Sequence, residues 1–270
     1  MITVELVKML RRPRTWVVIA MLVALPTLVA VLLAVTDLAP APGDGPPFLS
    51  AVLSDGTLFP LAALGVVLPL FLPIAVAVLG GDAIAGEAQT GTLRYLLARP
   101  VSRTQLLVAK LVTVVAFVLL AVLVVFVVTA VEGRLLLGDA PATGTVSLSG
   151  STLTPADLAV RTALALGYVV VSMLGVAAVA LFFSTLTSSS IGAALGTIGL
   201  LVASTVLLGL DAAGALHPFL PTRYWLAFVD LFRDPILWTE VGRGLAVQLG
   251  YLLVFTLAAW ASFTTKDIDD

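Results

Sequence analysis

Six long runs of apolar residues, each free of acidic and basic side chains, limit what this chain can fold into. They cover residues 15–35, 58–80, 111–131, 162–183, 191–210 and 245–263. A helix needs about 20 apolar residues to cross the apolar core of a bilayer, and each run is about that long. Helices satisfy their own backbone hydrogen bonds inside lipid. The sequence therefore predicts an all-α membrane protein with six transmembrane helices in a single domain, residues 1–270.

The rest of the composition excludes several classes of protein. Only 11% of the residues are charged, whereas a soluble domain has about 25%. The chain has no cysteine and a single histidine, His217, so thiolate chemistry and a histidine-rich metal site are excluded. An intramembrane protease would need paired catalytic groups or a metal motif, but the HExxH motif is absent and His217 lies in an outer loop. We therefore expect no catalysis, no metal site and no nucleic-acid partner.

The positions of lysine and arginine predict the orientation in the membrane. With the N-terminus inside, nine of these residues lie on the inner side and five on the outer side. The first outer loop, residues 36–57, has three aspartates and no basic residue. We therefore expect a protein of the inner membrane of a prokaryote, with both termini in the cytoplasm.

Residues 1–14 have the pattern of an amphipathic helix. The apolar residues that recur at helical spacing are Ile2, Leu6, Met9 and Leu10, and the basic residues that share another face are Lys8, Arg11 and Arg12. Such a helix lies in the headgroup layer with its basic face toward anionic lipid. Pro13 should end it, and Trp16 should anchor the first span at the interface. An ordinary basic flank without a separate helix is the alternative.

Two of the apolar runs carry helix-breaking or small residues. Pro60, Pro69 and Pro73 predict that the second run is a bent helix. Gly192 and Gly196 in the fifth run allow another helix to approach closely. The sequence leaves open whether that helix belongs to this chain or to a second copy.

An aromatic segment, residues 211–240, lies between the fifth and sixth runs. Trp225, Phe228, Val229 and Phe232 follow the i, i+3, i+4, i+7 spacing of a helix. Pro221 suits the first turn of that helix, and Pro235 should end it. We expect an amphipathic helix over residues 224–232 at the outer membrane surface.

A polar stretch, residues 81–110, separates the second and third runs. The sequence predicts a turn near Gly80 and Gly81, followed by a short helix over residues 91–98 that Pro100 ends. Ser102 and Gln105 fit a capping box that starts the next helix, which continues into the third span. A short rigid helix between two spans can transmit force, which a flexible loop cannot.

This stretch resembles the first cytoplasmic loop of the ABC-2-type permeases, the membrane subunits of ABC exporters whose ATPases are separate chains. The likeness rests on GDAIAGE, GTLRYLLARPVSR and Lys110, and departs at residues 88–90, where many relatives carry more charge. It extends to FFSTLTSSSIGAALG, HPFLPTRYW and the KDI near the C-terminus. The chain is most similar to the permeases of bacitracin resistance and of nitrous-oxide reductase maturation.

The resemblance implies an ABC-2 fold, similar to type V exporters, and a defined set of partners. Residues 1–14 would be an elbow helix, and a cytoplasmic loop, residues 81–105, would carry a coupling helix. The partners would be two ATPase subunits, which hold ATP and Mg, and a second copy or a similar permease, all within membrane lipid. The residues that would contact the ATPase are Glu87, Gly91, Thr92, Leu93, Arg94, Leu96, Leu97, Pro100 and Arg103.

The residues agree with that implication on one point, because the chain lacks a phosphate-binding loop of its own. The apolar spans suit an amphipathic or lipid-like cargo, but the sequence identifies no substrate-binding residue. An ion-coupled secondary transporter is one alternative, although all 16 acidic residues lie outside the six runs. A membrane scaffold that transports nothing is the other.

Overall fold

A computed structural model describes residues 1–36, 38, 44, 47–91, 102–138 and 145–265 of the chain. Six helices in these residues are long and apolar enough to cross a membrane. They lie in α2 (Pro13–Thr36), α4 (Phe71–Gln89), α6 (Arg103–Glu132), α7 (Pro155–Leu186), α8 (Ser190–Leu208) and α9 (Trp238–Thr265). The prediction of a helical membrane protein with six candidate spans is therefore confirmed at this level.

Shorter elements connect the long helices. The α-helices among them are α1 (Ile2–Arg11) and α3 (Phe59–Val67), and a π-helical turn, η3 (Gly133–Leu137), extends α6. The 3-10 helices are η1 (Leu49–Ala51), η2 (Gly56–Leu58), η4 (Asp211–Ala213), η5 (His217–Phe219) and η6 (Pro221–Phe232). Two short antiparallel strands, β1 (Thr145–Val146) and β2 (Thr152–Leu153), pair Thr145 with Leu153.

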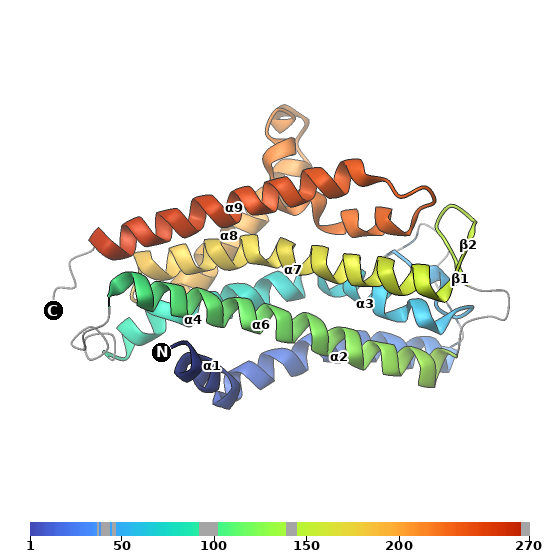
Figure 1. The fold of residues 1–270 in the computed structure, drawn as a ribbon, viewed down its shortest axis with the longest axis horizontal. Coiled ribbons are helices and arrows are strands. Elements are labelled where there is room, and N and C mark those ends of the chain that lie inside the picture. Colours follow the sequence, from blue (N-terminus) through green and yellow to red (C-terminus); the bar gives the residue numbers. More distant parts are fainter. Residues whose placement is uncertain (37, 39–43, 45–46, 92–101, 139–144, 266–270) are drawn as a thin grey trace.

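The long helices lie side by side along the longest axis of the molecule (Figure 1). Met1, the end of α4, the start of α6 and the end of α9 gather at one end, which we name the terminal end. The β1–β2 hairpin lies at the opposite end, which we name the hairpin end. Both termini of the described chain are therefore on the same side, as an even number of spans requires.

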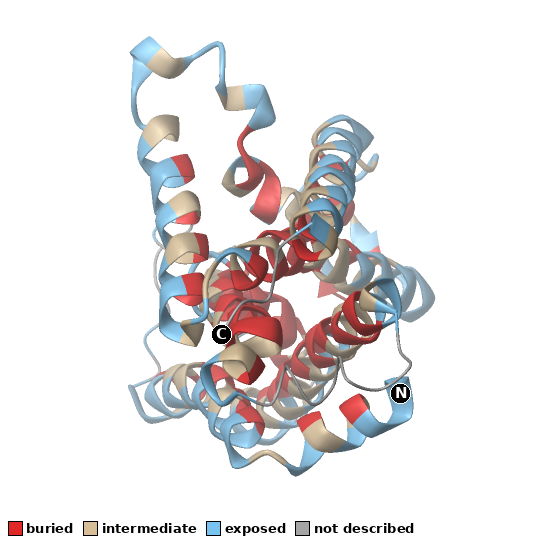
Figure 2. Cartoon of the chain, turned by 90° about the vertical axis from the view of Figure 1, so that its left-hand side faces the viewer, coloured by how far each residue is buried: buried red, intermediate tan, exposed pale blue. Residues whose placement is uncertain are grey.

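The helix α7 is the centre of the bundle and packs against α4, α8 and α9. Its inner face is rich in small side chains, and Ala177, Ala178 and Ala180 are fully buried. Small residues let neighbouring helices approach closely in a membrane protein. The buried residues accordingly cluster along the middle of the bundle in the view from the terminal end (Figure 2).

The second apolar run forms two helices instead of one bent helix. The helix α3 ends at Val67 and α4 begins at Phe71. Pro60 and Pro73 lie in the first turns of α3 and α4, where backbone N–H groups have no partner within the helix, and Pro69 lies in the break. The three prolines therefore mark two helix starts and a junction, and the expectation of one bent helix over residues 58–80 is wrong.

The expected turn at Gly80 and Gly81 is also wrong, because both glycines lie inside α4. A Cβ atom on Gly80 would lie 2.7 Å from the Cβ of Ala180, and one on Gly81 would lie 2.9 Å from the backbone nitrogen of Ala194. These glycines let α4 pack closely on α7 and α8. The helix continues to Gln89, so Asp82 and Glu87 belong to the same helix as the apolar residues before them.

The aromatic segment forms the predicted helix, and the rest of the chain covers its aromatic face. The helix η6 has 3-10 geometry, and its Trp225, Phe228 and Phe232 are buried against the rest of the chain. Tyr168 Oη of α7 donates to Tyr224 O at 2.6 Å. The aromatic side chains of this helix are thus packed on α7 and α9, whereas the position of the helix at the outer membrane surface stays a prediction.

The two glycines of the fifth run have different neighbours. A Cβ atom on Gly196 would lie 2.9 Å from the ring of Phe183 in α7, whereas one on Gly192 would meet only residues of the turn before it. Gly196 therefore serves packing inside this chain, and Gly192 faces outward.

Candidate functional site

A buried ionic cluster joins α1, α4 and α6 at the terminal end. Lys110 Nζ lies 2.7 Å from Glu5 Oε2 and also binds Glu87 Oε1. Lys8 Nζ binds the same Glu87 oxygen at 2.6 Å. Glu5, Glu87 and Lys110 are 7%, 2% and 4% exposed, so these charges depend on one another for stabilisation.

Asp82, about one and a half turns before Glu87, forms a second ionic centre on α4. Its Oδ2 lies 3.0 Å from Arg12 Nη1, and its Oδ1 lies 2.9 Å from Arg14 Nη1. Ser190 Oγ donates to the same Oδ1 at 2.8 Å. One carboxylate thus connects the junction between α1 and α2 to the start of α8.

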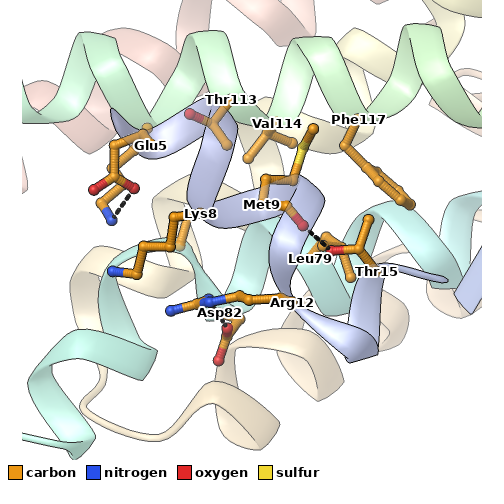
Figure 3. A pocket seen from close by; sticks show the side chains of 12 residues that line it. Glu5, Lys8, Met9, Arg12, Thr15, Leu79, Asp82, Thr113, Val114 and Phe117 are labelled. Carbon is orange, nitrogen blue, oxygen red and sulfur yellow. Dashed lines mark hydrogen bonds and ion pairs between the residues drawn. The ribbon is translucent and has the colours of Figure 1, made fainter. Parts of the chain in front are cut away.

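The space beside these charges is a small cavity between α1, α4 and α6. Figure 3 shows Glu5 and Lys8 from α1, Arg12 from the junction after it and Asp82 from α4 around the cavity, together with the apolar Met9 and Phe117. Its volume of about 40 Å³ suits an ordered water and is far too small for an organic ligand. The cluster is therefore a structural connection between helices and no binding pocket.

A metal ion has no site in the part of the chain that the structure describes, because no three His, Cys, Asp or Glu side chains there are grouped to hold one. The carboxylates of the cluster face lysine and arginine instead.

The first turn of α6 is attached to the last turn of α9. Arg103 Nη1 donates to the carbonyl oxygens of Phe263 at 3.2 Å and Thr264 at 3.1 Å. Trp260 Nε1 donates to Thr104 Oγ1 at 3.0 Å. A cationic side chain at the carboxyl end of a helix satisfies its free carbonyl groups and complements its dipole. The predicted capping box of Ser102 and Gln105 is present and fixes the start of α6.

The side chain of Ser184 in α7 forms hydrogen bonds with backbone groups of α4 on both sides of Asp82. Ser184 Oγ accepts from the N–H groups of Ile84 at 3.0 Å and Ala85 at 2.9 Å, and donates to Gly81 O at 2.7 Å. A side chain inserted into the hydrogen-bond ladder is a recognised cause of helix bending. The charged end of α4 is thereby attached to α7 as well as to α1 and α6.

Comparison with known families places this chain. A model of a protein family of unknown function, DUF2705, matches residues 47–268, which is well over half of the chain. The chain belongs to the DUF2705 family. No curated protein matches it. The match includes Asp82, Glu87 and Lys110 of the cluster, whereas α1 lies before the matched residues.

The residues that the sequence singled out in this DUF2705 protein fall into two groups. Glu87, Gly91 and Arg103 are described: Glu87 is buried in the cluster, Gly91 has a positive φ of 69° just after α4, and Arg103 binds the end of α9. Six others lie outside the described residues: Thr92, Leu93, Arg94, Leu96, Leu97 and Pro100. The structure therefore describes the residues that come directly before and after residues 92–101.

Sequence reasoning missed most of the ionic cluster. Lys8 and Arg12 were expected to face anionic lipid, but they bind Glu87 and Asp82. The i, i+3 spacing of Glu5 and Lys8 places both on one face of α1, which was a usable signal for a contact with charged residues. Nothing local to Ser184 indicates its contact with α4.

Proposed function

We propose that this chain is the membrane-spanning permease subunit of an ATP-driven exporter of the ABC-2 type. The observation that carries the proposal is that described residues on either side of residues 92–101 are anchored to other helices. Before the segment, Glu87 binds α1 and α6, and after it Arg103 binds the end of α9. A push on this segment would therefore reach several spans at once, as the coupling of a separate ATPase to transport requires.

In this proposal, α1 is the elbow helix and residues 81–105 form the coupling loop. The ion pairs of Glu5 and Lys8 hold α1 against α4 and α6, while Ile2, Val4 and Leu10 are exposed. An amphipathic helix with such a face lies at the membrane surface. The helix α1 would move together with the coupling loop.

The terminal end would face the cytoplasm of a prokaryotic cell. This orientation follows from the excess of lysine and arginine on that side of the sequence. Two ATPase subunits would bind there and hold ATP and Mg, and a second copy or a similar permease would complete the assembly. The cargo would be amphipathic or lipid-like, and this chain would catalyse no reaction.

An ion-coupled transporter is the second candidate, and one observation favours it. Glu87 and Lys110 are buried charges in two helices that are candidate spans, and such residues often belong to ion pathways. Their mutual ion pair and the position of Glu87 in the last turn of α4 favour a structural role instead. Transport driven by an ion gradient in vesicles without ATP would support this second candidate over the first.

The proposal is tested by purifying a tagged chain from its native membranes and measuring the ATP hydrolysis that accompanies it. The wild type should bring an ABC ATPase with it. Leu96→Asp should remove most of that ATPase, because a charge is placed in an apolar contact, whereas Arg94→Ala at the rim should remove less. Leu148→Asp is the matched control, since Leu148 is an exposed leucine near the hairpin end.

The outcomes separate the explanations. Normal ATPase recovery with Leu96→Asp, or a wild type without any ATPase, would contradict the proposed function. If the leucines of residues 91–98 pack only on this chain's own helix ends, Leu96→Asp should instead reduce the amount of folded permease itself.

A further inference from the structure

An apolar groove runs along one face of α9, away from the ionic cluster. Its volume is about 530 Å³, within the range of ligand sites in proteins. One wall is a stripe of α9, and the other wall is Phe219 of η5. The residues of the stripe are Ala246, Val247, Gly250, Tyr251, Val254 and Phe255.

The second wall belongs to an arm formed by α8, η4 and η5. In Figures 1 and 2 this arm is the uppermost part of the molecule, and its tip stands out from the bundle. Phe219 is 68% exposed, and a Cβ atom added to Gly250 would meet nothing within 4 Å. The groove is thus open and has no occupant from this chain among the described residues.

The length and position of the groove match one leaflet of a bilayer. Ala246 and Phe255 are nine residues apart, which is about 14 Å of helix at about 1.5 Å per residue. Half of the roughly 30 Å apolar core of a bilayer is about the same length. The helix continues from Thr256 to Thr265 for about 15 Å more, which is the length of the other leaflet.

A basic side chain lies at the open end of this stripe. Arg243 is three residues before Ala246 and four before Val247, so it shares their face of α9 one turn nearer the hairpin end. Its side chain is 61% exposed, and its Nη1 forms an ion pair with Glu240 Oε1 at 2.9 Å. Trp238, five residues earlier, is exposed, and tryptophan favours the membrane interface.

We propose that this groove holds one acyl chain of a membrane phospholipid, with its phosphate group beside Arg243. The apolar and aromatic wall, Tyr251 stacked on Phe255 with ring centres 5.6 Å apart, suits a flexible hydrocarbon chain. An apolar stripe about one leaflet long with a basic side chain beyond its end matches an anionic phospholipid in both length and charge, which favours this occupant over a helix of a second copy. This inference rests on the membrane placement of α9 and does not depend on ATP-driven export.

The test is native mass spectrometry of the detergent-purified chain titrated with phosphatidylglycerol. One phospholipid should bind per chain. Gly250→Leu, which fills the groove, should weaken this binding at least fivefold. Gly242→Leu is the matched control, because Gly242 is also open on α9 but does not line the groove, and it should bind as the wild type does. Arg243→Gln should reduce the preference for phosphatidylglycerol over phosphatidylcholine.

A second measurement needs no variant. Phosphatidylglycerol with a photoreactive acyl chain should cross-link to residues 246–255 of the wild type more than to the exposed Val17, Met21 and Leu28 of α2. Equal labelling of both helices, or equal binding by both glycine variants, would overturn the proposal. A Gly250→Leu protein with unchanged lipid binding but an altered oligomeric state would assign the groove to a second copy instead.

Discussion

Lys110 Nζ lies 2.7 Å from Glu5 Oε2, and through this contact α6 holds the N-terminal helix against the bundle. The same ammonium group binds Glu87 of α4, so one lysine is shared by carboxylates from two other helices. Removal of one partner from a buried ionic group leaves the remaining charges uncompensated, which costs much more than the pair itself contributes. The integrity of the terminal end therefore depends strongly on Lys110.

We predict that Lys110→Met destabilises the protein by about 3–5 kcal/mol, because Glu5 and Glu87 lose their buried partner. Thermal unfolding in detergent, followed by circular dichroism, measures the loss. Lys8→Met is the control, since the Lys8 side chain is 38% exposed, and it should cost about 1 kcal/mol or less. Equal losses in the two variants would show that the buried cluster is not the stabilising unit.

We predict that Gly80→Val destabilises the protein by about 1–3 kcal/mol or more through overpacking. The new Cβ atom would lie 2.7 Å from the Cβ of Ala180, and neither helix can move away without separating α4 from α7. Gly199→Val in α8 should be tolerated, because nothing lies within 4 Å of its added Cβ. The yield of monodisperse protein and its unfolding temperature compare the two variants, and a well-folded Gly80→Val protein would contradict the close contact.

These glycines illustrate what the sequence could and could not predict. The number of spans, the position of five of them and the capping box at Ser102 depend on local length and pattern, so they were predictable. Gly80 and Gly81 have the local pattern of a turn. Their actual role is close packing against alanines about 100 residues later in the chain, and no local pattern indicates it. The aromatic residues of η6 had the spacing of a surface helix, but only the folded chain shows that α7 and α9 cover them.

The ionic cluster was hidden for the same reason. Glu5, Glu87 and Lys110 come from three helices that are far apart in sequence, and each looks like an ordinary charged flank of an apolar run. The separate starts of α3 and α4 were readable in part from Pro60 and Pro73, which are better placed in first turns than inside one long helix. Pro69, in the break at residues 68–70, fits a kink inside one helix as well as a break between two helices, so the sequence alone did not decide between them.

We predict that Ser184→Ala destabilises the protein by about 1–3 kcal/mol, because the buried N–H groups of Ile84 and Ala85 lose their acceptor. Thr205→Ala is the control, since the Thr205 hydroxyl donates only to Leu201 O of its own helix, and it should cost less. Hydrogen exchange of the amides in α4 gives a second readout. Faster exchange at Ile84 and Ala85 is expected, and unchanged exchange would show that α4 closes its own hydrogen bonds without the serine.

The last prediction concerns the orientation of the bundle, on which the site of ATPase binding depends. Because the chain has no cysteine, single cysteines report on one position each. Ser54 and Ser149 are exposed near the hairpin end, and Ser102 is exposed at the terminal end. In intact cells, cysteines at the first two positions should react with a membrane-impermeant maleimide, and a cysteine at Ser102 should react only after the membrane is opened.

Ser147 lies on the same hairpin as Ser149 but is buried, with its hydroxyl 2.7 Å from that of Ser151, so a cysteine there should react slowly on either side. The opposite pattern, with Ser102→Cys labelled in intact cells, would place residues 92–101 outside the cell, where no ATPase could act on them.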